Sequence, residues 1–302
     1  MRTDIEFKAD GTPLRGWFYR PDDCTAPCPT VVMTHGFSAV KEMHLDRFAE
    51  VFAAAGLAVL VYDHRGFGAS DGAVRQEIDP VAQIRDYRHA LTYAATRPDV
   101  DAQRLGVWGT SYSGGHALVL GAIDRRVKCV VAQAPLISGW RNVQRLVRAD
   151  LLAGLRAMCD ADRAAVFAGA APALLPVVTN DPGVPCALPT SDCYPWFAET
   201  AAARAPAWRN ELTLRSFEML MEYEPGATIE RISPTPLLMI VAKNDHLTVA
   251  DEAFGAYERA LQPKKLVIID GGHFDAYGVG FEITSAAARD WLCEHLHVSR
   301  PR

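Results

Sequence analysis

The sequence predicts an α/β protein in which a mostly parallel sheet is covered by helices. Short apolar runs, of the kind buried in parallel sheets, alternate with segments whose apolar residues recur at helical spacing. This alternation is typical of strand–helix–strand units, which place successive strands parallel. The chain has 302 residues, of which 49% are hydrophobic, so it can bury a large core. Functional side chains are then expected just past the carboxyl ends of the strands.

The first part of the chain shows this alternation most regularly. Residues 3–20 read as a hairpin, because two alternating segments flank the turn signal Asp10-Gly11. Gly56 is placed to end the first helix, and Pro80 is placed to begin the second. We expect strands at residues 30–34, 57–62, 104–108 and 127–132, and helices at residues 41–55, 80–97 and 116–122.

The regular order stops between residues 136 and 232. This segment has no clean strand pattern, and helical patches at residues 143–158 and 211–223 alternate with loops such as residues 177–195. Strand and helix patterns then resume. We therefore predict a core formed by residues 1–135 and 233–302, with a mainly helical cap at residues 136–232. The later core elements are strands at 236–242 and 265–270 and helices at 251–260 and 281–296.

One stretch carries the strongest functional signal, Gly109-Thr110-Ser111-Tyr112-Ser113-Gly114-Gly115. It lies between a predicted strand and a predicted helix, the context of a nucleophile elbow. In that turn a serine hydroxyl stands clear of the sheet, and small neighbours let the helix return close to the strand. Ser111 is favoured as the nucleophile because Gly109 precedes it by two residues. Ser113 remains the alternative, with Gly115 following it.

A serine nucleophile needs a base, and the base needs a carboxylate that holds its tautomer. His273 follows a late strand through a glycine pair, unlike the other eight of the nine histidines. Asp245 ends the preceding strand and gives the chain order serine, acid, histidine. Asp251 and Asp270 are the alternative acids, although Asp251 lies where a helix cap is expected.

The oxyanion of an acyl-transfer reaction requires N–H donors. The residue after the nucleophile, Tyr112, supplies one donor, and the loop after the first parallel strand supplies the other, which indicates Phe37. The predicted cap contains Trp140, Trp196 and Trp208. Because ligand pockets are lined mainly by apolar and aromatic side chains, these three are candidate substrate-binding residues.

Composition excludes several classes of protein. The formal net charge is −5 and no basic run is present, so the electrostatic pattern of a nucleic-acid binder is missing. No apolar run approaches the length of a bilayer span, and residues 1–7 lack the apolar core of a signal peptide. Seven scattered cysteines argue against a disulfide framework, with Cys24 and Cys28 in a proline-rich loop. We expect a soluble, cytoplasmic enzyme with no metal or cofactor and no nucleic-acid or membrane partner; monomer and homodimer both remain open.

Taken together, these pieces resemble the α/β-hydrolase superfamily over nearly the whole chain. Within it, the segments around Ser111 and Gly271-Gly272-His273 are similar to dienelactone-hydrolase-like and xylan-esterase-like serine hydrolases, and also to fungal polyketide transferases. The resemblance implies a sheet of about eight strands and a cap after the sixth core strand. It also implies Ser111 as nucleophile, His273 as base and Asp245 as acid. Ser113 stands where the common elbow motif has glycine. The matching pieces are His35-Gly36-Phe37, the motif from Asp63 to Gly72, the elbow, Asp245 and Gly271-Gly272-His273.

The predicted activity is hydrolysis of a carboxylic ester or thioester of a small to medium acyl compound through an acyl-enzyme on Ser111. An acyltransferase would use the same residues with an alcohol or amine in place of water, so the sequence does not separate the two. A prolyl peptidase would need a group that holds a free amine, and the cap shows no carboxylate identifiable as one. A non-catalytic ligand receptor on the same fold is the alternative of another class.

Overall fold

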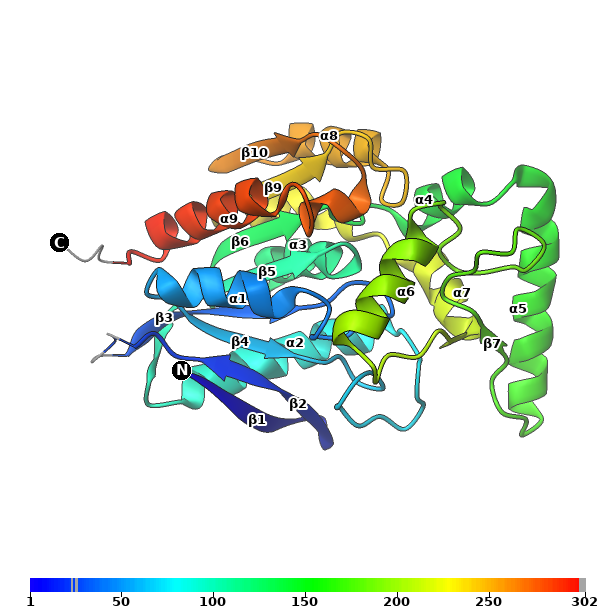
Figure 1. Cartoon of the computed structure of the whole chain (residues 1–302), viewed down its shortest axis with the longest axis horizontal. Coiled ribbons are helices and arrows are strands. Elements are labelled where there is room, and N and C mark those ends of the chain that lie inside the picture. The colour runs from blue at the N-terminus through cyan, green and yellow to red at the C-terminus, as the bar shows by residue number, and fades with distance from the viewer. Residues whose placement is uncertain (23, 25–26, 299–302) are drawn as a thin grey trace.

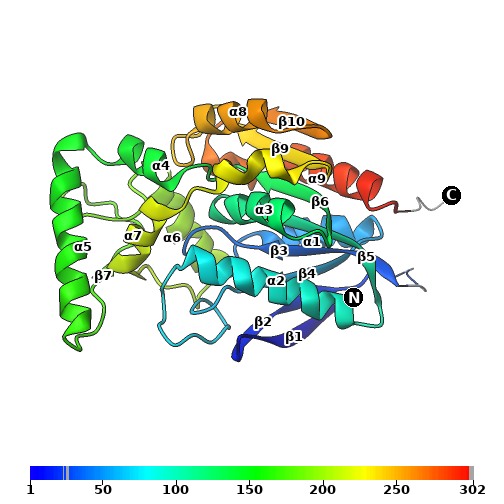
Figure 2. The ribbon, with the colours of Figure 1, turned by 180° about the vertical axis from the view of Figure 1, so that it is seen from behind.

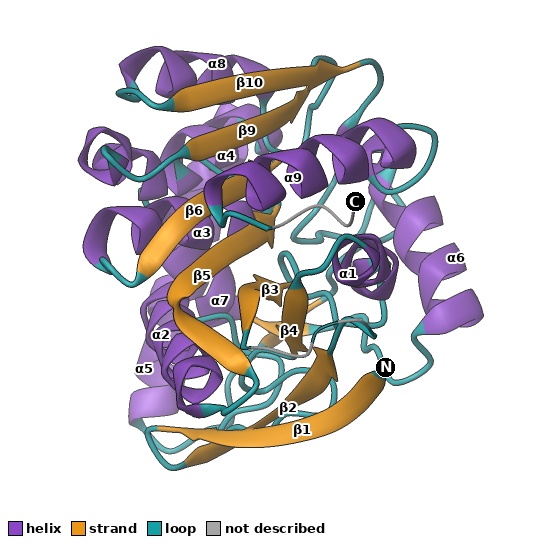
Figure 3. Ribbon diagram, turned by 90° about the vertical axis from the view of Figure 1, so that its left-hand side faces the viewer, coloured by secondary structure: helices purple, strands orange, loops and turns teal. Residues whose placement is uncertain are grey.

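The computed structural model describes residues 1–22, 24 and 27–298. Its central feature is an eight-stranded sheet with the strand order β1-β2-β4-β3-β5-β6-β9-β10 (Figures 1 and 3). Strands β4, β3, β5, β6, β9 and β10 pair in parallel, so the predicted mostly parallel α/β sheet is confirmed. The strands are β1 (Arg2–Ala9), β2 (Thr12–Tyr19), β3 (Cys28–Thr34), β4 (Ala58–Tyr62), β5 (Val100–Thr110), β6 (Val127–Gln133), β9 (Leu237–Ala242) and β10 (Lys264–Ile269).

The N-terminal hairpin forms one edge of the sheet, with β1 antiparallel to β2 and β2 antiparallel to β4. Its alternating pattern places Ile5, Phe7, Ala9 and Leu14 in the core, while Glu6 and Lys8 are exposed. The inner strands β3 and β4 are instead buried on both faces, as their continuous apolar runs predict. Hydrophobic pattern thus distinguishes the edge hairpin from the inner parallel strands.

Helices cover both faces of the sheet (Figures 1 and 2). On one face α2, α3 and α8 enclose a core that includes Tyr87, Leu118 and Ala253. On the other face α1 and α9 enclose a second core that includes Phe48 and Trp291. The core helices are α1 (Leu45–Ala54), α2 (Pro80–Thr96), α3 (Tyr112–Ile123), α8 (Ala250–Arg259) and α9 (Phe281–His295).

The chain between β6 and β9 gathers at one end of the sheet, the end toward which the parallel strands run (Figure 1). This insert follows the sixth strand in the chain, as predicted, and it is mainly helical. The predicted helix at 143–158 is interrupted, because Val147 takes an extended conformation after the first helix ends. Helix α6 was not predicted. The insert comprises α4 (Gly139–Leu146), η1 (Ala149–Leu151), α5 (Leu152–Phe167), β7 (Leu174–Leu175), α6 (Cys193–Arg204), β8 (Leu212–Thr213), α7 (Leu214–Glu222) and η2 (Pro225–Ile232).

The cap shares a third apolar core with the loops at the carboxyl ends of the strands. Val143, Phe197 and Leu220 from the insert pack in one cluster with Phe37 and Tyr112 from the core loops. The two short strands β7 and β8 pair with each other and not with the main sheet. The insert is therefore fixed by side-chain packing over the loops that carry the candidate catalytic residues.

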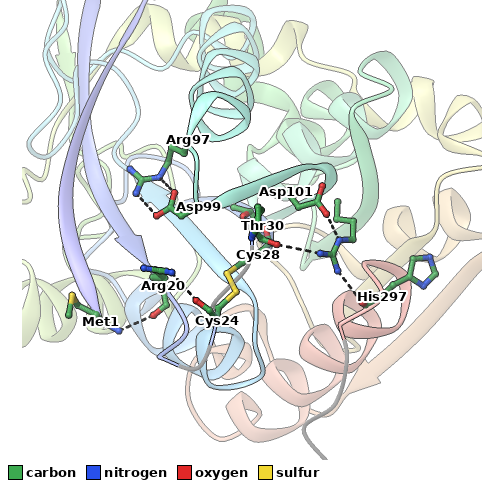
Figure 4. The surroundings of a disulfide bond; sticks show 11 residues. Met1, Arg20, Cys24, Cys28, Thr30, Arg97, Asp99, Asp101 and His297 are labelled. Atoms are coloured by element: carbon green, nitrogen blue, oxygen red, sulfur yellow. Dashed lines mark hydrogen bonds and ion pairs between the residues drawn. A yellow bond between two sulfur atoms is a disulfide. The ribbon is translucent and has the colours of Figure 1, made fainter.

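The scattered cysteines argued against a disulfide framework, and they gave no indication of the one disulfide found among the described residues. Cys24 and Cys28 form a disulfide between the loop after β2 and the start of β3 (Figure 4). Residues 23, 25 and 26 of this predicted loop lie outside the described residues. The spacing of four positions gave no disulfide signal in a chain with an odd cysteine count, and only the folded loop brings the two sulfurs together. Among the described helices, none combines the length and apolar character needed to cross a membrane.

Candidate active site

Ser111 occupies a strained turn between β5 and α3. Its φ is 58° and its ψ is −121°, a backbone conformation that residues other than glycine rarely adopt. The turn is held because the Ser111 amide donates to the Gln133 carbonyl on β6 at 2.8 Å. Gly109 is required by the close return of the helix, since a Cβ there would lie 1.9 Å from the Ser113 carbonyl oxygen. This geometry is that of a nucleophile elbow.

Three residues from separate loops form a hydrogen-bonded chain beside this turn. The His273 Nε2 lies 3.0 Å from the Ser111 Oγ, and the His273 Nδ1 lies 2.7 Å from an Asp245 carboxylate oxygen. All three side chains are buried, with exposed fractions of 8% or less. The arrangement can transfer the Ser111 proton to the imidazole while the carboxylate stabilises the resulting imidazolium.

Asp245 is held as an anion by its own loop. One carboxylate oxygen accepts from the N–H groups of Leu247 and Thr248 at 2.8 and 2.9 Å, and the other accepts from the Thr248 hydroxyl at 3.0 Å. Burial alone raises the pKa of this carboxyl. The neighbouring His273 ring and the Thr248 hydrogen bonds outweigh burial and hold the pKa below its usual value.

The alternative acids lie elsewhere. The Asp251 side chain is 57% exposed and pairs with Arg145, and the Asp270 side chain is 90% exposed and pairs with Lys243. Neither carboxylate contacts His273. The structure thus brings Asp245, and not its two rivals, to the imidazole.

Ser113 faces away from the site, and its role is visible in its contacts. Its fully buried hydroxyl donates to the His35 carbonyl oxygen and lies 2.9 Å from the His64 Nε2. The His64 amide in turn donates to the His35 Nε2 at 3.1 Å. Ser113, which stands where the common elbow motif has glycine, therefore links the elbow by hydrogen bonds to the loops after β3 and β4. No contact with His273 is seen for it among the described residues.

Two backbone N–H groups of the loops beside Ser111 are free of protein acceptors among the described residues. Within the part of the chain that the structure describes, the N–H groups of Phe37 and Tyr112 donate to no protein acceptor. The Phe37 loop approaches the nucleophile closely, because a Cβ on Gly36 would lie 2.9 Å from the Ser111 Cβ. The Phe37 and Tyr112 rings meet edge to face at 5.4 Å, which fixes the loop against the elbow.

A pocket with about 630 Å³ of empty space, its open mouth included, lies over Ser111. Apart from Ser111 and His273, its wall is mainly apolar, and it is shared between the core loops and the cap. The core contributes Phe37, Ala39, Met43, Leu45, Leu247, Phe274 and Tyr277 among others, and the cap contributes Leu136, Asn142, Leu146, Leu188, Trp196, Phe197 and Leu220.

Only one of the three candidate tryptophans lines this pocket. Trp196 stacks on Phe274 with 4.5 Å between ring centroids. Trp208 instead packs on Phe197 from behind and donates its indole N–H to the Ser38 carbonyl at 2.8 Å. Trp140 lies under the Arg156 guanidinium, outside the lining. Aromatic content alone did not distinguish pocket residues from cap packing.

Sequence reasoning missed Thr248 and Asn142. Thr248 follows Asp245 by three residues, the spacing at which an Asp side chain accepts from the backbone of its own turn. That signal could have identified the loop. Asn142 lies on α4 and carries no local signal of its position in the pocket. No group of three or more His, Cys, Asp or Glu side chains suited to a metal ion occurs among the described residues.

Comparison with known proteins identifies the family. A model of the X-Pro dipeptidyl-peptidase (S15 family) matches residues 10–275. The chain belongs to this S15 family. A thiohydrolase of Eupenicillium brefeldianum is 34% identical over 288 residues, covering 93% of this chain and 91% of the relative. A polyketide transferase, grgF of Penicillium sp, is 30% identical over 304 residues, covering 98% and 97%.

Solved structures agree with the family assignment. The crystal structure of the α/β hydrolase GrgF from Penicillium sp. sh18 superposes with a TM-score of 0.86 at 28% identity, covering 98% of this chain and 99% of that one. The resemblance to α/β hydrolases is thereby confirmed. The S15-family chain is a hydrolase of the α/β-hydrolase type.

Thr248 provides a test of how the acid is positioned. Its hydroxyl contacts an Asp245 oxygen at 3.0 Å, the Ala134 carbonyl at 2.9 Å and the His273 Nδ1 at 3.2 Å. We expect Thr248→Val to lower kcat about tenfold with little change in KM, because one hydrogen bond that orients the acid and base is lost. Thr248→Ser, which keeps the hydroxyl, should restore most of kcat.

The same substitution should alter the acid stability of the protein. A carboxyl whose pKa is lowered by folding contributes stability above its unfolded pKa, and this contribution is lost as pH falls through the folded pKa. Thr248→Val removes one cause of the lowered pKa of Asp245, so the stability lost on acidification should be smaller than in the wild type, and the loss should be complete at a higher pH. Urea unfolding between pH 3 and 7 measures this. Equal acid profiles for Thr248→Val and Thr248→Ser would contradict the role of the hydroxyl.

Proposed function

We propose that this chain hydrolyses carboxylic esters or thioesters with an apolar acyl group through an acyl-enzyme on Ser111. The observation that carries the proposal is the chain of contacts from Ser111 to His273 at 3.0 Å and from His273 to Asp245 at 2.7 Å, at the base of an apolar pocket. A buried serine, imidazole and carboxylate in this order are suited to nucleophilic acyl transfer.

In the proposed mechanism, the Ser111 oxygen attacks the substrate carbonyl while His273 accepts its proton. Asp245 stabilises the imidazolium, and the N–H groups of Phe37 and Tyr112 bind the oxyanion, each worth about 3 kcal/mol in comparable sites. Collapse of the tetrahedral intermediate breaks the bond to the alcohol or thiol, which takes the proton from His273. Water, activated by the same imidazole, then releases the acid and regenerates Ser111.

The pocket wall supports an acyl substrate over the peptide substrate that the family description names. An enzyme acting on the free N-terminus of a peptide needs an anionic or carbonyl partner for the ammonium group. No Asp or Glu occurs among the described residues that line the pocket. The thiohydrolase relative supports a thioester as the scissile group, and the polyketide transferase relative supports an acyl chain as the part held by the pocket.

Acyl transfer is the second candidate. The polyketide transferase relative favours it, because an alcohol or amine can replace water in the second half of the same mechanism. Product analysis separates the two reactions: incubation with an acyl thioester and a set of alcohols and amines yields free acid from a hydrolase and a new ester or amide from a transferase.

A panel of acyl esters and thioesters with graded chain length tests the proposal. We expect turnover of apolar acyl thioesters and labelling of Ser111 by a fluorophosphonate probe, and no release of X-Pro dipeptides from peptides. Cleavage of X-Pro peptides in the absence of thioester or ester turnover would overturn it.

Trp196 should set part of the acyl preference. We expect Trp196→Ala to shift the preferred chain length or lower kcat/KM for the best ester about tenfold, because it removes an aromatic wall of the pocket. Trp140→Ala is the matched control, since Trp140 belongs to the same cap but lies outside the lining. The same ranking of substrates in both variants and in the wild type would contradict this assignment.

We also propose a cytoplasmic location. The thiols of Cys129, Cys159, Cys186 and Cys193 support it, because unpaired cysteines are common in reducing compartments. The Cys24–Cys28 disulfide does not support this location, because disulfides are rare in reducing compartments. Fractionation of the source cells, with activity followed on the best ester of the panel, tests the location.

A further inference from the structure

The pocket wall contains few polar side chains, and several of them are committed to partners in the protein. The His35 ring contacts the Gly36 carbonyl through Nδ1 and accepts from the His64 amide through Nε2. The Thr110 hydroxyl contacts the Tyr277 hydroxyl, and the Thr248 hydroxyl contacts Asp245. The Tyr112 hydroxyl has no hydrogen-bond partner among the described residues, but protein atoms enclose it.

Asn142 is one of the polar side chains of the wall with an uncommitted donor. Its side chain is only 6% exposed, and it lines the pocket from the cap. Its Oδ1 accepts from the Val249 amide at 3.3 Å, which fixes the orientation of the side-chain amide because an N–H donor must face the oxygen. Within the residues that the structure describes, its Nδ2 donates to no protein acceptor. Asn142 therefore lines the pocket with an NH₂ group that has no protein partner among the described residues.

The helix that carries Asn142 is held firmly in place. The Ser138 side chain caps α4 and donates to Glu224 at 2.8 Å, and the Trp140 amide donates to the same carboxylate oxygen at 3.2 Å. A Cβ on Gly139 would lie 1.7 Å from the Leu220 carbonyl oxygen, so α4 begins in close contact with α7. Asn142 is thus preorganised by contacts that do not involve a substrate.

Burying an amide without a partner costs free energy, and the cost is recovered when a ligand supplies the acceptor. We propose that Asn142 donates a hydrogen bond from Nδ2 to a second oxygen of the substrate, and that this residue selects oxygenated acyl compounds over plain alkyl ones. The inference rests on the proposed ester or thioester hydrolysis. The acceptor is a keto or hydroxyl oxygen on the acyl chain, or an amide oxygen on the thiol leaving group.

Asn142 is hydrogen-bonded to the loop that contacts His273. Val249, its hydrogen-bond partner, follows Thr248, whose hydroxyl lies 3.2 Å from the His273 Nδ1. The acceptor oxygen is therefore expected within a few bonds of the scissile carbonyl, and 3-oxo and 3-hydroxy acyl groups are the appropriate probes.

The test compares substrates in pairs that differ by one oxygen. The first pair is a 3-hydroxyacyl and an unsubstituted acyl thioester of equal chain length with a plain alkylthiol. The second pair is an unsubstituted acyl thioester of N-acetylcysteamine and one of a plain alkylthiol of equal length. We expect the wild type to prefer the oxygenated member of one pair by about tenfold in kcat/KM, the size that one hydrogen bond in a closed site supplies.

Two substitutions and a control decide the outcome. Asn142→Leu removes the amide, and Asn142→Asp at pH 8 keeps the acceptor for Val249 but removes the donor. Both should abolish the preference. Leu146→Ala, on the same helix and in the same pocket wall, should lower kcat/KM for both members of a pair and keep their ratio. Circular dichroism verifies folding; if Asn142→Leu does not fold, Asn142→Asp decides.

The pair that responds identifies the source of the oxygen. Loss of the preference in the first pair places it on the acyl chain, and loss in the second places it on the leaving group. A wild type without preference in either pair, or variants that keep the wild-type ratios, would overturn the inference while the hydrolase assignment stands. If no ester or thioester is turned over, the proposed function fails. The role of Asn142 can then still be decided from binding. For each pair, the ratio of dissociation constants is compared between Ser111→Ala and Ser111→Ala/Asn142→Asp.

Discussion

Ser111→Ala is expected to lower kcat/KM for the best ester by about 10⁴-fold or more and to abolish labelling by a fluorophosphonate. Loss of the nucleophile removes the acyl-enzyme route altogether, and removal of such a serine in a comparable triad costs about 10⁶-fold in kcat. The residual rate comes from the Phe37 and Tyr112 donors and the pocket, which the substitution leaves in place. Burst and steady-state kinetics with a chromogenic ester measure both effects.

Ser113→Ala is the matched control, because it alters the other serine of the same turn. We expect it to keep labelling and part of the activity, since its hydroxyl contacts His35 and His64 and not His273. The substitution should destabilise the protein by about 1–3 kcal/mol, because the buried His35 carbonyl and the His64 ring each lose a hydrogen-bond partner. Loss of labelling in Ser113→Ala together with normal labelling in Ser111→Ala would reverse the assignment of the nucleophile.

Asp245→Asn is expected to lower kcat by about 10³- to 10⁴-fold with a small change in KM. The side-chain amide can still accept from Leu247 and Thr248, so the loop should keep its shape. However, an NH₂ group facing the His273 Nδ1 favours the wrong tautomer and leaves the imidazolium without a counter-charge, an effect of about 10⁴-fold in a comparable triad. Steady-state kinetics at several pH values, with fluorophosphonate labelling rates, measures the loss.

Asp251→Asn and Asp270→Asn are the controls for this experiment. Both carboxylates are exposed and pair with basic side chains at the surface, so each substitution should change kcat less than threefold. If Asp245→Asn retained a rate near the wild type and one of the two controls lost it, the acid would have to be reassigned, and the contact between Asp245 and His273 would be structural only.

The sequence by itself determined the core fold and the position of the nucleophile turn. Both depend on local patterns: apolar runs and helical spacing predict the parallel strands and their covering helices, and the glycines around Ser111 predict a turn that only small residues permit. The sequence also placed Phe37, Asp245 and His273 just past the ends of predicted strands. Parallel strands present their carboxyl ends on the same side, so these residues were expected at one edge of the sheet.

The tertiary structure decided what depends on contacts between distant segments. It separated Ser111 from Ser113 and Asp245 from Asp251 and Asp270, since which side chain reaches the imidazole is fixed by loop geometry and burial. It also placed Trp196 in the pocket wall and left Trp140 and Trp208 outside it.

The cap and the cysteine pair show the same limit. The break between α4 and α5, helix α6 and the contact between Cys24 and Cys28 were not predicted. Asn142 carries no sequence signal, because its position in the pocket comes from the capping of α4 by Ser138 and Glu224 and from the packing of Gly139 on α7. Local pattern therefore specifies the core that carries the chemistry. The residues that line the pocket depend on how the insert packs over that core, and packing between distant segments has no periodic signature in the sequence.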